Sequence, residues 1–238
     1  MKRLTIDIGN TRTKTAVFSN GQIIQVNIFD SNPDTLNELL NNCLYDEAIV
    51  CQVSGQQLPS HSKRLHVLSH DTPLPISINY STPRTLGLDR IAAAAGANDL
   101  YSGTNCLVID AGTAITYDFV TAEGVFLGGN IAPGVAMRYV SLHEHTALLP
   151  KLDKTENELP PFGKTTESAM RCGVECGIAA EVAYWHKMAQ NVMGKSMVII
   201  TGGDADTLAK RIENNIECQI QHHLVHYGLN AILRHTKQ

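Results

Sequence analysis

Two short stretches of the sequence place a carboxylate and a glycine together at points where a strand is expected to turn. In LTIDIGNTRTKTAVF, Asp7 precedes Gly9, and in CLVIDAGTAITYDFV, Asp110 precedes Gly112. A threonine follows each glycine within two residues. Because glycine has no side chain, a ligand can approach the backbone of such a turn closely, and its N–H groups can bind a phosphate.

Asp7 alone is a poor phosphate ligand, because the two negative charges repel. Its presence is explained if a hydrated Mg²⁺ lies between the carboxylate and the phosphates, since Mg²⁺ keeps waters and takes few carboxylates. Lys14 adds a cation, Asn10 an amide and Thr11 a hydroxyl. The repeated turn therefore predicts a site for a magnesium–nucleotide complex, although one Asp-x-Gly turn alone is equally typical of an ordinary strand connection.

The elements around the first turn predict a strand-rich half. Apolar and polar residues alternate over 4–8 and 15–18, as in strands, and Ser19-Asn20-Gly21 is a strong hairpin signal. An alanine-rich helix begins at Gly87. The pattern also predicts strands over 22–28, 48–53 and 65–68, and a helix over 32–44.

The same strand–turn–strand–turn–strand unit recurs from Cys106 to Leu127. We therefore expect an α/β chain of two similar halves, residues 1–103 and 104–238. The second half is expected to continue with a glycine-rich turn region over 128–134, a loop over 150–163, a helix from Thr165 or Thr166 to about 192, a strand over 197–200, a glycine turn over 201–204 and a helix over 227–235.

Composition excludes several classes of protein. The chain has 238 residues, a formal net charge of −4 and a sequence pI of about 6.2, so it presents no basic field for nucleic acid. No apolar run reaches the roughly 20 residues of a membrane span, and the N-terminal segment does not match a signal peptide. We expect a cytoplasmic protein with no membrane or nucleic-acid partner.

The six cysteines do not follow the spacing of a disulfide scaffold, so reduced and mostly buried thiols are expected. Cys172 and Cys176 lie one helical turn apart, as do His222 and His226. Zinc could bind such pairs, but neither matches a short-spaced zinc motif. Helix packing is the favoured interpretation of both pairs.

Beyond these local signals, the ordered set of motifs resembles the type III pantothenate kinases, a family of the acetate kinase, sugar kinase, Hsp70 and actin superfamily. The stretch from Asp7 to Lys14 looks like the first phosphate motif of that family, and Asp110-Ala111-Gly112-Thr113 looks like the second. Gly87-Leu88-Asp89-Arg90 is similar to its Gly-x-Asp-Arg substrate motif. The stretches GGNIAPG at 128–134 and TGG at 201–203 also match, in order, so the resemblance covers essentially the whole chain.

The resemblance implies two RNase H-like halves of the actin-like ATPase type with a nucleotide cleft between them, and ATP-dependent phosphorylation of pantothenate to 4'-phosphopantothenate, the first step of coenzyme A biosynthesis. In addition to the Mg²⁺ expected beside Asp7, it implies a monovalent cation, either K⁺ or NH₄⁺, and it implies a homodimer. ATP is expected at Asp7, Ile8, Gly9, Asn10, Thr11, Arg12, Thr13, Lys14 and Thr113. Pantothenate is expected at Tyr80, Gly87, Leu88, Asp89, Arg90 and Thr166, with Thr166 supplied by the other subunit.

By the same resemblance, Asp89 is the catalytic base and Asp110 binds the monovalent cation. The local chemistry is compatible, because a carboxylate in the first turn of a helix is stabilised by the helix dipole and can accept a hydroxyl proton. Arg90 can pair with the substrate carboxylate. The residues alone leave other readings open: Asp89 could simply stabilise its helix, Asp110 could be a second Mg²⁺ ligand, and Thr166 could be a helix cap.

Two other functions remain alternatives at this stage. Another small-molecule kinase of the same superfamily, acting on a sugar or an acyl group, would share the phosphate turns but is expected to lack the Gly-x-Asp-Arg and GGNIAPG combination. A non-catalytic regulator on this fold would keep the nucleotide site and lose the base. Asp7, Lys14, Asp89 and Asp110 are all present, which favours an enzyme.

Overall fold

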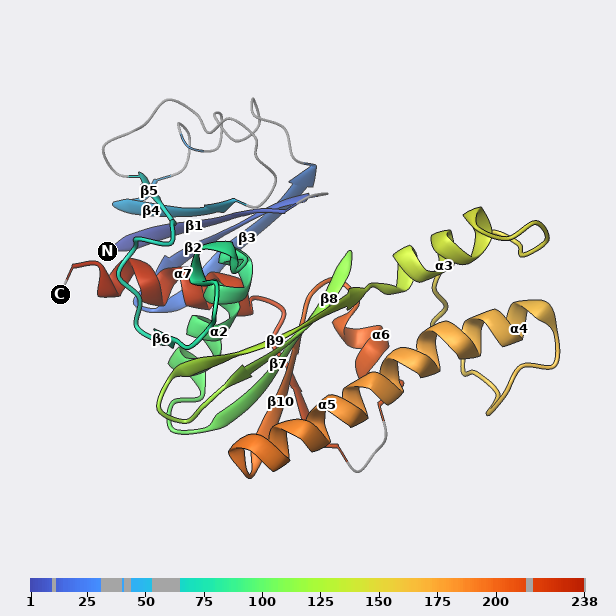
Figure 1. Ribbon diagram of the computed structural model, residues 1–238. Coiled ribbons are helices and arrows are strands. Elements are labelled where there is room, and N and C mark those ends of the chain that lie inside the picture. The colour runs from blue at the N-terminus through green and yellow to red at the C-terminus, as the bar shows by residue number, and fades with distance from the viewer. Residues whose placement is uncertain (10–11, 31–39, 41–43, 53–64, 213–215, 238) are drawn as a thin grey trace. The chain divides into compact units, whose positions relative to one another are not determined.

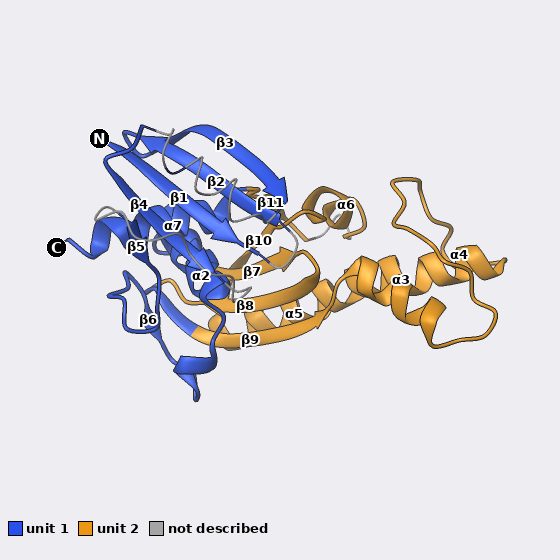
Figure 2. Cartoon of the chain, turned by 90° about the horizontal axis from the view of Figure 1, so that it is seen from above, with its two compact units in different colours: residues 1–103, 123–126, 223–238 blue, residues 104–122, 127–222 orange. Residues whose placement is uncertain are grey.

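The computed structural model describes residues 1–9, 12–30, 40, 44–52, 65–212 and 216–237 (Figure 1). The predicted helix over 32–44 falls almost entirely outside these residues. The chain divides into two compact units (Figure 2). Unit 1 comprises residues 1–103, 123–126 and 223–238, and unit 2 comprises 104–122 and 127–222. Residues 123–126 and the C-terminal segment thus pack with the first unit, although the expected halves assigned them to the second.

The sheet of unit 1 has the order β3-β2-β1-β4-β5. The antiparallel strands β1 (Lys2–Ile8), β2 (Arg12–Ser19) and β3 (Gln22–Asp30) confirm the predicted meander, and β1 pairs in parallel with β4 (Glu47–Gln52). Strand β5 (Leu65–Val67) pairs in parallel with β4. The predicted β2–β3 hairpin forms on Asn20 and Gly21, whose φ angles of 51° and 81° suit a tight two-residue turn.

The two faces of this sheet are covered differently. Leu4, Ile6 and Ile8 alternate onto one face and join an apolar cluster with residues of β2 and β4. On the other face, Phe18 packs edge-to-face on Tyr227 of α7 (Leu224–His235), with the ring centroids 5.5 Å apart. Figure 1 shows α7 lying along the sheet, so the last helix of the chain completes the core of its first unit.

A buried polar contact ties α7 to β1. The Thr5 hydroxyl donates to the carbonyl oxygen of Ala16 (3.2 Å), so it must accept the hydrogen bond from Nδ1 of His226 (2.8 Å). His226 is 2% exposed. Burial, reinforced by the charges of His223 and Lys14, lowers the pKa of His226 to about 3, so the imidazole is neutral at physiological pH.

Helices α2 (Leu88–Leu100) and α7 cross with their backbones in direct contact. A Cβ at Gly228 would lie 1.7 Å from the carbonyl oxygen of Ala92, and a Cβ at Gly96 would lie 2.2 Å from that of Leu224. Only glycine fits at either position. The alanine-rich sequence of α2 therefore serves a tightly packed buried helix: its residues from 90 to 97 are all buried.

The sheet of unit 2 repeats the opening pattern. Strands β7 (Asn105–Ala111) and β8 (Ala114–Val120) are antiparallel, and β10 (Ser196–Thr201) and β11 (Cys218–Ile220) add in parallel beyond β7. Strand β9 (Val125–Pro133) lies beside β8. The prediction of a glycine-rich turn over 128–134 was wrong for most of this stretch: it continues β9, and only Gly134 leaves the strand.

The helices of unit 2 are α3 (Val135–Glu144), α4 (Thr166–Arg171), a π-helical turn η2 (Cys172–Cys176), α5 (Gly177–Met193) and α6 (Ala205–Ala209). Together α4, η2 and α5 form the long helix predicted to run to about 192. Side chains of α5 pack on Leu107, Ile109 and Tyr117 of the sheet. Helices α3 and α6 carried too little periodic signal over their short lengths to be predicted.

Two short elements complete unit 1. A 3₁₀ turn, η1 (Pro83–Thr85), precedes α2, and β6 (Ser77–Ile78) pairs with the first residues of β9.

In the part of the chain that the structure describes, no helix has the length and apolar character needed to cross a membrane.

The glycine contact of α2 and α7 predicts a large effect of Gly228→Ala. The added methyl group would meet the carbonyl oxygen of Ala92 and force the helices apart, a form of overpacking that costs about 1–3 kcal/mol or more. Urea unfolding should show a lower free energy of unfolding. Gly177→Ala, where the added Cβ meets nothing within 4 Å in α5, is the control and should be neutral or stabilising. Equal losses in the two variants would contradict this account.

Candidate active site

The first predicted turn closes the β1–β2 hairpin of unit 1. The N–H of Gly9 donates to the carbonyl oxygen of Arg12 (3.1 Å), and Ile8 pairs with Thr13 at the last rung of the ladder. Arg12 is exposed, Thr13 is buried, and Lys14 is partly buried. Asn10 and Thr11, predicted to bind phosphate, lie outside the described residues.

Asp7 is the centre of a row of side chains that crosses three strands. Its register partners are Lys14 on β2 and Cys51 on β4, and paired residues project to the same face of a sheet. This is also the face of Thr5, two residues before Asp7, which contacts α7. The first turn therefore presents a carboxylate and a lysine together on the helix-covered side of the sheet.

Asp89 belongs to the same group. Burial, followed by the charges of Asp7 and Asp89, raises the pKa of the Cys51 thiol well above its usual value. Cys51 is fully buried, it is the register partner of Asp7, and its strand β4 contacts α2, which carries Asp89. The fold thus brings together two motifs that are 82 positions apart in the sequence, Asp7 and Asp89, around a neutral thiol.

The first residues of α2 hold the Asp89 carboxylate in one orientation. Its Oδ1 accepts a hydrogen bond from the backbone N–H of Arg90 (2.9 Å). Gly87 precedes the helix as its N-cap residue, and a Cβ there would lie 2.4 Å from Oδ1 of Asp89. Glycine at this position of the Gly-x-Asp-Arg motif leaves the space that the carboxylate occupies. Leu88 is the first helical residue and is partly buried.

Tyr80 and Arg90, both predicted substrate residues, meet around one aromatic ring. The guanidinium carbon of Arg90 lies 5.7 Å from the centroid of Phe126, and the ring of Tyr80 lies 6.1 Å from it in an edge arrangement. Phe126 could not be singled out from the sequence, because only the folded chain places it beside Tyr80 and Arg90. Tyr80 is partly buried and Arg90 is 6% exposed.

The second predicted turn closes the β7–β8 hairpin of unit 2. The N–H of Gly112 donates to the carbonyl oxygen of Ala114 (3.1 Å), which matches the Gly9–Arg12 bond of the first turn. Thr113 is exposed and Asp110 is partly buried. Both turns are thus closed by a hydrogen bond from the glycine N–H to a backbone carbonyl oxygen beyond the turn, although the first turn is one residue longer.

Two further glycines press against this second turn. A Cβ at Gly134 would lie 2.2 Å from the carbonyl oxygen of Gly112 and 2.5 Å from that of Thr113. A Cβ at Gly202 would lie 2.3 Å from the carbonyl oxygen of Ala111 and 2.5 Å from Oδ1 of Asp110, and Gly202 has a φ of 95°. Gly134 of GGNIAPG and Gly202 of TGG therefore let three backbone segments meet at Asp110–Thr113.

Thr166 lies in a different part of unit 2. Thr165, not Thr166, caps α4: its hydroxyl accepts from the Ser168 N–H, and the Ser168 hydroxyl accepts from the Thr165 N–H. Thr166 is the first helical residue, is exposed, and borders an apolar pocket of about 740 Å³. The pocket is lined by Pro133, Arg138, Ser141, Leu142, Leu149, Thr166, Ala169, Met170, Gly173 and Val174.

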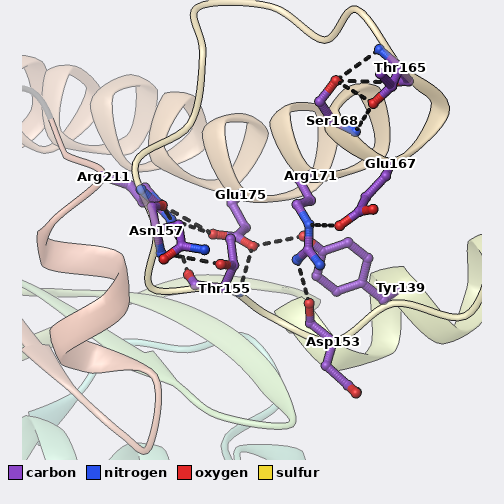
Figure 3. A network of polar contacts seen from close by, with 10 residues as sticks. All are labelled: Tyr139, Asp153, Thr155, Asn157, Thr165, Glu167, Ser168, Arg171, Glu175 and Arg211. Atoms are coloured by element: carbon purple, nitrogen blue, oxygen red, sulfur yellow. Dashed lines mark hydrogen bonds and ion pairs between the residues drawn. The ribbon is translucent and has the colours of Figure 1, made fainter.

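A polar network holds the segment before α4 in place (Figure 3). Glu175, 3% exposed in the π-helical turn, accepts from the Tyr139 hydroxyl (2.8 Å), the Thr155 N–H (3.2 Å) and the Arg211 guanidinium (3.0 Å). Arg211 also donates to the carbonyl oxygens of Thr155 (3.0 Å) and Asn157 (2.6 Å). Burial and then the bond to Glu175 raise the pKa of Tyr139, so its hydroxyl stays protonated and donates.

The network continues toward α4 and the TGG turn. Arg171 joins Glu167 on α4 (3.0 Å) to the carbonyl oxygen of Asp153 (2.7 Å). Lys154 pairs with Asp204, whose N–H donates to the carbonyl oxygen of Ala111 (2.9 Å). The predicted loop over 150–163 is thus fixed at successive positions, which sequence reasoning did not detect because its partners lie far along the chain.

The described cysteines are all free. Cys51 and Cys106 are buried, as expected. Cys172 and Cys218 are only partly buried and Cys176 is exposed, so the expectation of buried thiols was wrong for these three. His226 bonds to Thr5, and His222 lies 3.6 Å from Asp206. Among the described residues, no three His, Cys, Asp or Glu side chains gather as a metal site, so the zinc alternative gains no support.

Comparison with known proteins identifies the family. The sequence model of the type III pantothenate kinases matches residues 3–188. A type III pantothenate kinase of Phocaeicola vulgatus is 37% identical over 240 aligned residues, which cover 98% of each chain. The chain belongs to the type III pantothenate kinase family.

Solved structures agree at the level of the fold. A putative Baf family transcriptional activator from Campylobacter jejuni has a TM-score of 0.66 at 24% identity, covering 97% of each chain. The activator of 2-hydroxyisocaproyl-CoA dehydratase from Clostridium difficile, with bound ADPNP, has a TM-score of 0.59 at 16% identity, covering 100% of this chain and 96% of that one. The expectation of an α/β fold of the actin-like ATPase and sugar kinase type is confirmed.

The glycine contacts of the second turn predict that Gly202→Ala weakens nucleotide binding in this kinase. The methyl group would displace Ala111 and Asp110 and so distort the turn proposed to bind phosphate, and a loss of about 1.4 kcal/mol of binding free energy would lower the affinity for ATP about tenfold. Calorimetric titration with the non-hydrolysable analogue ADPNP measures the nucleotide affinity of each variant. Gly203→Ala is the matched control, because its Cβ meets nothing within 4 Å and its φ is unstrained; equal affinities for both variants would refute this prediction.

Proposed function

We propose that this chain transfers the terminal phosphoryl group of ATP to the primary hydroxyl of pantothenate, forming 4'-phosphopantothenate, the entry step to coenzyme A. Family membership supports the reaction, and one structural observation carries it: Asp7 lies in one row of the sheet with Lys14 and Cys51, and β4, which carries Cys51, contacts α2, which carries Asp89. A phosphate-turn carboxylate and a candidate base therefore share one locality of unit 1. The expected cytoplasmic location stays a prediction.

We assign ATP phosphate binding to the two hairpin turns. In unit 1 the assigned residues are Asp7, Ile8, Gly9, Asn10, Thr11, Arg12, Thr13 and Lys14, and in unit 2 the assigned residue is Thr113. The glycines of the second turn support the assignment, because they create a backbone surface that a side chain would fill. That both turns hold one nucleotide, each from its own half of the chain (1–103 and 104–238), remains a prediction.

The residues present fit the expected cations. Mg²⁺ would be held beside Asp7 chiefly by phosphates and waters, because this ion keeps several waters and takes few carboxylates. When bound, Mg²⁺ would neutralise charge on the transferred phosphoryl group. We assign K⁺ or NH₄⁺ to Asp110, where carboxylate and backbone carbonyl oxygens converge around Gly202.

The acceptor residues have complementary tasks. Asp89 would accept the proton of the pantothenate hydroxyl and orient its oxygen toward the phosphorus, since phosphoryl transfer depends mainly on positioning and on charge stabilisation. Gly87 leaves room for that carboxylate. Arg90 would pair with the pantothenate carboxylate, with Leu88 and Tyr80 lining the acceptor site.

We also propose a homodimer that covers the apolar surface around α3 and α4. Met137 and Val140 on α3 are exposed, as are Leu148 and Phe162 in the following segment, and they accompany the pocket beside Thr166. A surface of this kind on a monomer commonly marks a protein interface. Thr166 would then reach the acceptor site of the partner subunit.

A turnover assay tests the proposed reaction and the proposed base together. Purified protein with ATP, Mg²⁺ and K⁺ should release ADP when pantothenate is present, and a panel of sugars and acyl acceptors should give none. Asp89→Asn should lower kcat at least about a hundredfold while affinity for ADPNP changes less than twofold, because only proton acceptance is lost. Asp99→Asn, on the same helix, is the control and should retain activity.

Each outcome decides between the candidates. Turnover of a sugar in place of pantothenate would favour another kinase of the superfamily. Nucleotide binding with no turnover of any acceptor would favour a regulator. Normal turnover by Asp89→Asn would remove Asp89 from its assigned role.

A charge placed on α3 tests the proposed dimer interface. Val140→Asp places a charge on the α3 surface and should convert a dimer into a monomer, as measured by light scattering during size-exclusion chromatography. Val192→Asp alters a valine near the end of α5 that is even more exposed than Val140, and it should leave the dimer intact. A wild-type monomer, or a dimer that survives Val140→Asp, would contradict the proposed interface.

A further inference from the structure

We propose that Phe126 is a positioning residue of the acceptor site, and that its ring fixes the Arg90 guanidinium and the Tyr80 ring before pantothenate binds. The proposal rests on the proposed function for the identity of the acceptor. Its structural basis is a single buried ring that two predicted substrate residues contact from different segments of the chain.

Phe126 is itself rigidly held. It is fully buried at the start of β9, where it is the register partner of Ile78 on β6. Its carbonyl oxygen accepts the N–H of Asn79 (2.8 Å), and the preceding Gly124 accepts the N–H of Ser77 (2.9 Å). A fully buried ring on a paired strand has one position, so it can serve as a reference surface for its neighbours.

The backbone and the side chain of Phe126 both act on Tyr80. Asn79, whose N–H binds the Phe126 carbonyl, immediately precedes Tyr80 in the chain. The Tyr80 ring then meets the Phe126 ring at an interplanar angle of 67°, with the centroids 6.1 Å apart. An edge arrangement of this kind is favourable because the positive edge of one ring faces the negative face of the other.

The same ring constrains Arg90. Its guanidinium carbon lies 5.7 Å from the ring centroid, within the range of a cation–π contact, and the residue is 6% exposed. Arginine has many rotamers in solution, and losing them on binding would weaken the complex. Because the ring face holds the planar guanidinium in advance, a carboxylate can pair with it at a lower entropic cost.

This arrangement predicts which kinetic constant Phe126 controls. Arg90 and Tyr80 would contact pantothenate in the ground state and in the transition state alike, so losing their orientation removes uniform binding. Asp89 and the two turns are held by backbone hydrogen bonds instead: the Arg90 N–H donates to Asp89, and the Gly9 and Gly112 N–H groups close the turns. Phe126→Leu should therefore raise KM for pantothenate about tenfold or more, while kcat and KM for ATP change less than about twofold.

The experiment compares Phe126→Leu with Phe18→Leu. Phe18 is also buried in unit 1 and also makes an edge-to-face contact, with Tyr227, but it lies on β2 under α7. Both variants should lose thermal stability, and only Phe126→Leu should lose pantothenate affinity. Phe126→Met provides a second variant, because methionine nearly preserves the volume without an aromatic face, and it serves if Phe126→Leu does not fold.

A spectroscopic measurement separates this proposal from the proposed function. A guanidinium over a ring face is shielded by the ring current, so the Nε–H proton of Arg90, assigned with Arg90→Lys, should resonate upfield in NMR spectra of arginine-labelled protein. The shift should vanish in Phe126→Met and persist in Phe18→Leu. This readout needs no turnover and no acceptor.

The outcomes are distinct. A rise in pantothenate KM alone, with loss of the Arg90 shift, supports the proposal. Equal rises in both KM values, the same kinetic change in Phe18→Leu, or no upfield shift in the wild type overturns it. If the wild type does not phosphorylate pantothenate, the proposed function fails, and the NMR result alone decides whether Phe126 positions Arg90.

Discussion

The backbone contact of α2 with α7 is the constraint on which the proposed acceptor site depends. Gly96 and Gly228 leave no space for a side chain, so the two helices have one separation. Helix α7 is in turn tied to the sheet by the His226–Thr5 bond and the Tyr227–Phe18 pair. The start of α2, which carries Asp89, is thereby held at a fixed place beside the strands that carry Asp7 and Cys51. A residue near the C-terminus thus determines the geometry of a site built from the first ninety residues.

Close backbone contacts allowed by glycine also occur at the two turns proposed to bind phosphate. Gly9 and Gly112 close their hairpins with equivalent backbone bonds, and Gly134 and Gly202 let two more segments reach the second turn. A surface made of backbone cannot change rotamer, so its N–H and C=O groups keep their directions when a phosphate or a cation arrives. Preorganisation of this kind is what phosphoryl transfer chiefly requires of a protein, since the chemistry needs positioning and charge stabilisation more than covalent participation.

Unit 2 uses polar side chains for a different purpose. The carboxylate of Glu175 is buried, yet it accepts from Tyr139, the Thr155 backbone and Arg211, so its charge is compensated. Glu175 lies in the π-helical turn, where an extra residue per turn changes which side chains face inward. The network fixes a long segment without regular secondary structure against the helix that begins at Thr166, and Lys154 extends it to the TGG turn through Asp204.

The sequence by itself determined the features that depend on neighbouring residues. Alternation of apolar residues and the Asn20-Gly21 turn specified the first meander, and the Asp-x-Gly repeats marked both hairpin ends, because a turn or a strand is set by a few adjacent side chains. The motif order also indicated the family. Glycine content was misleading for GGNIAPG: glycine is typical of turns, but 128–133 continue β9, and only Gly134, which lies close to the backbone of the second turn, leaves the strand. Only the tertiary structure decided that the last helix packs in the first unit, that Phe126 joins Tyr80 to Arg90, and that Glu175 meets Arg211. These contacts join residues far apart in the chain, and their energies arise only when the whole core is packed.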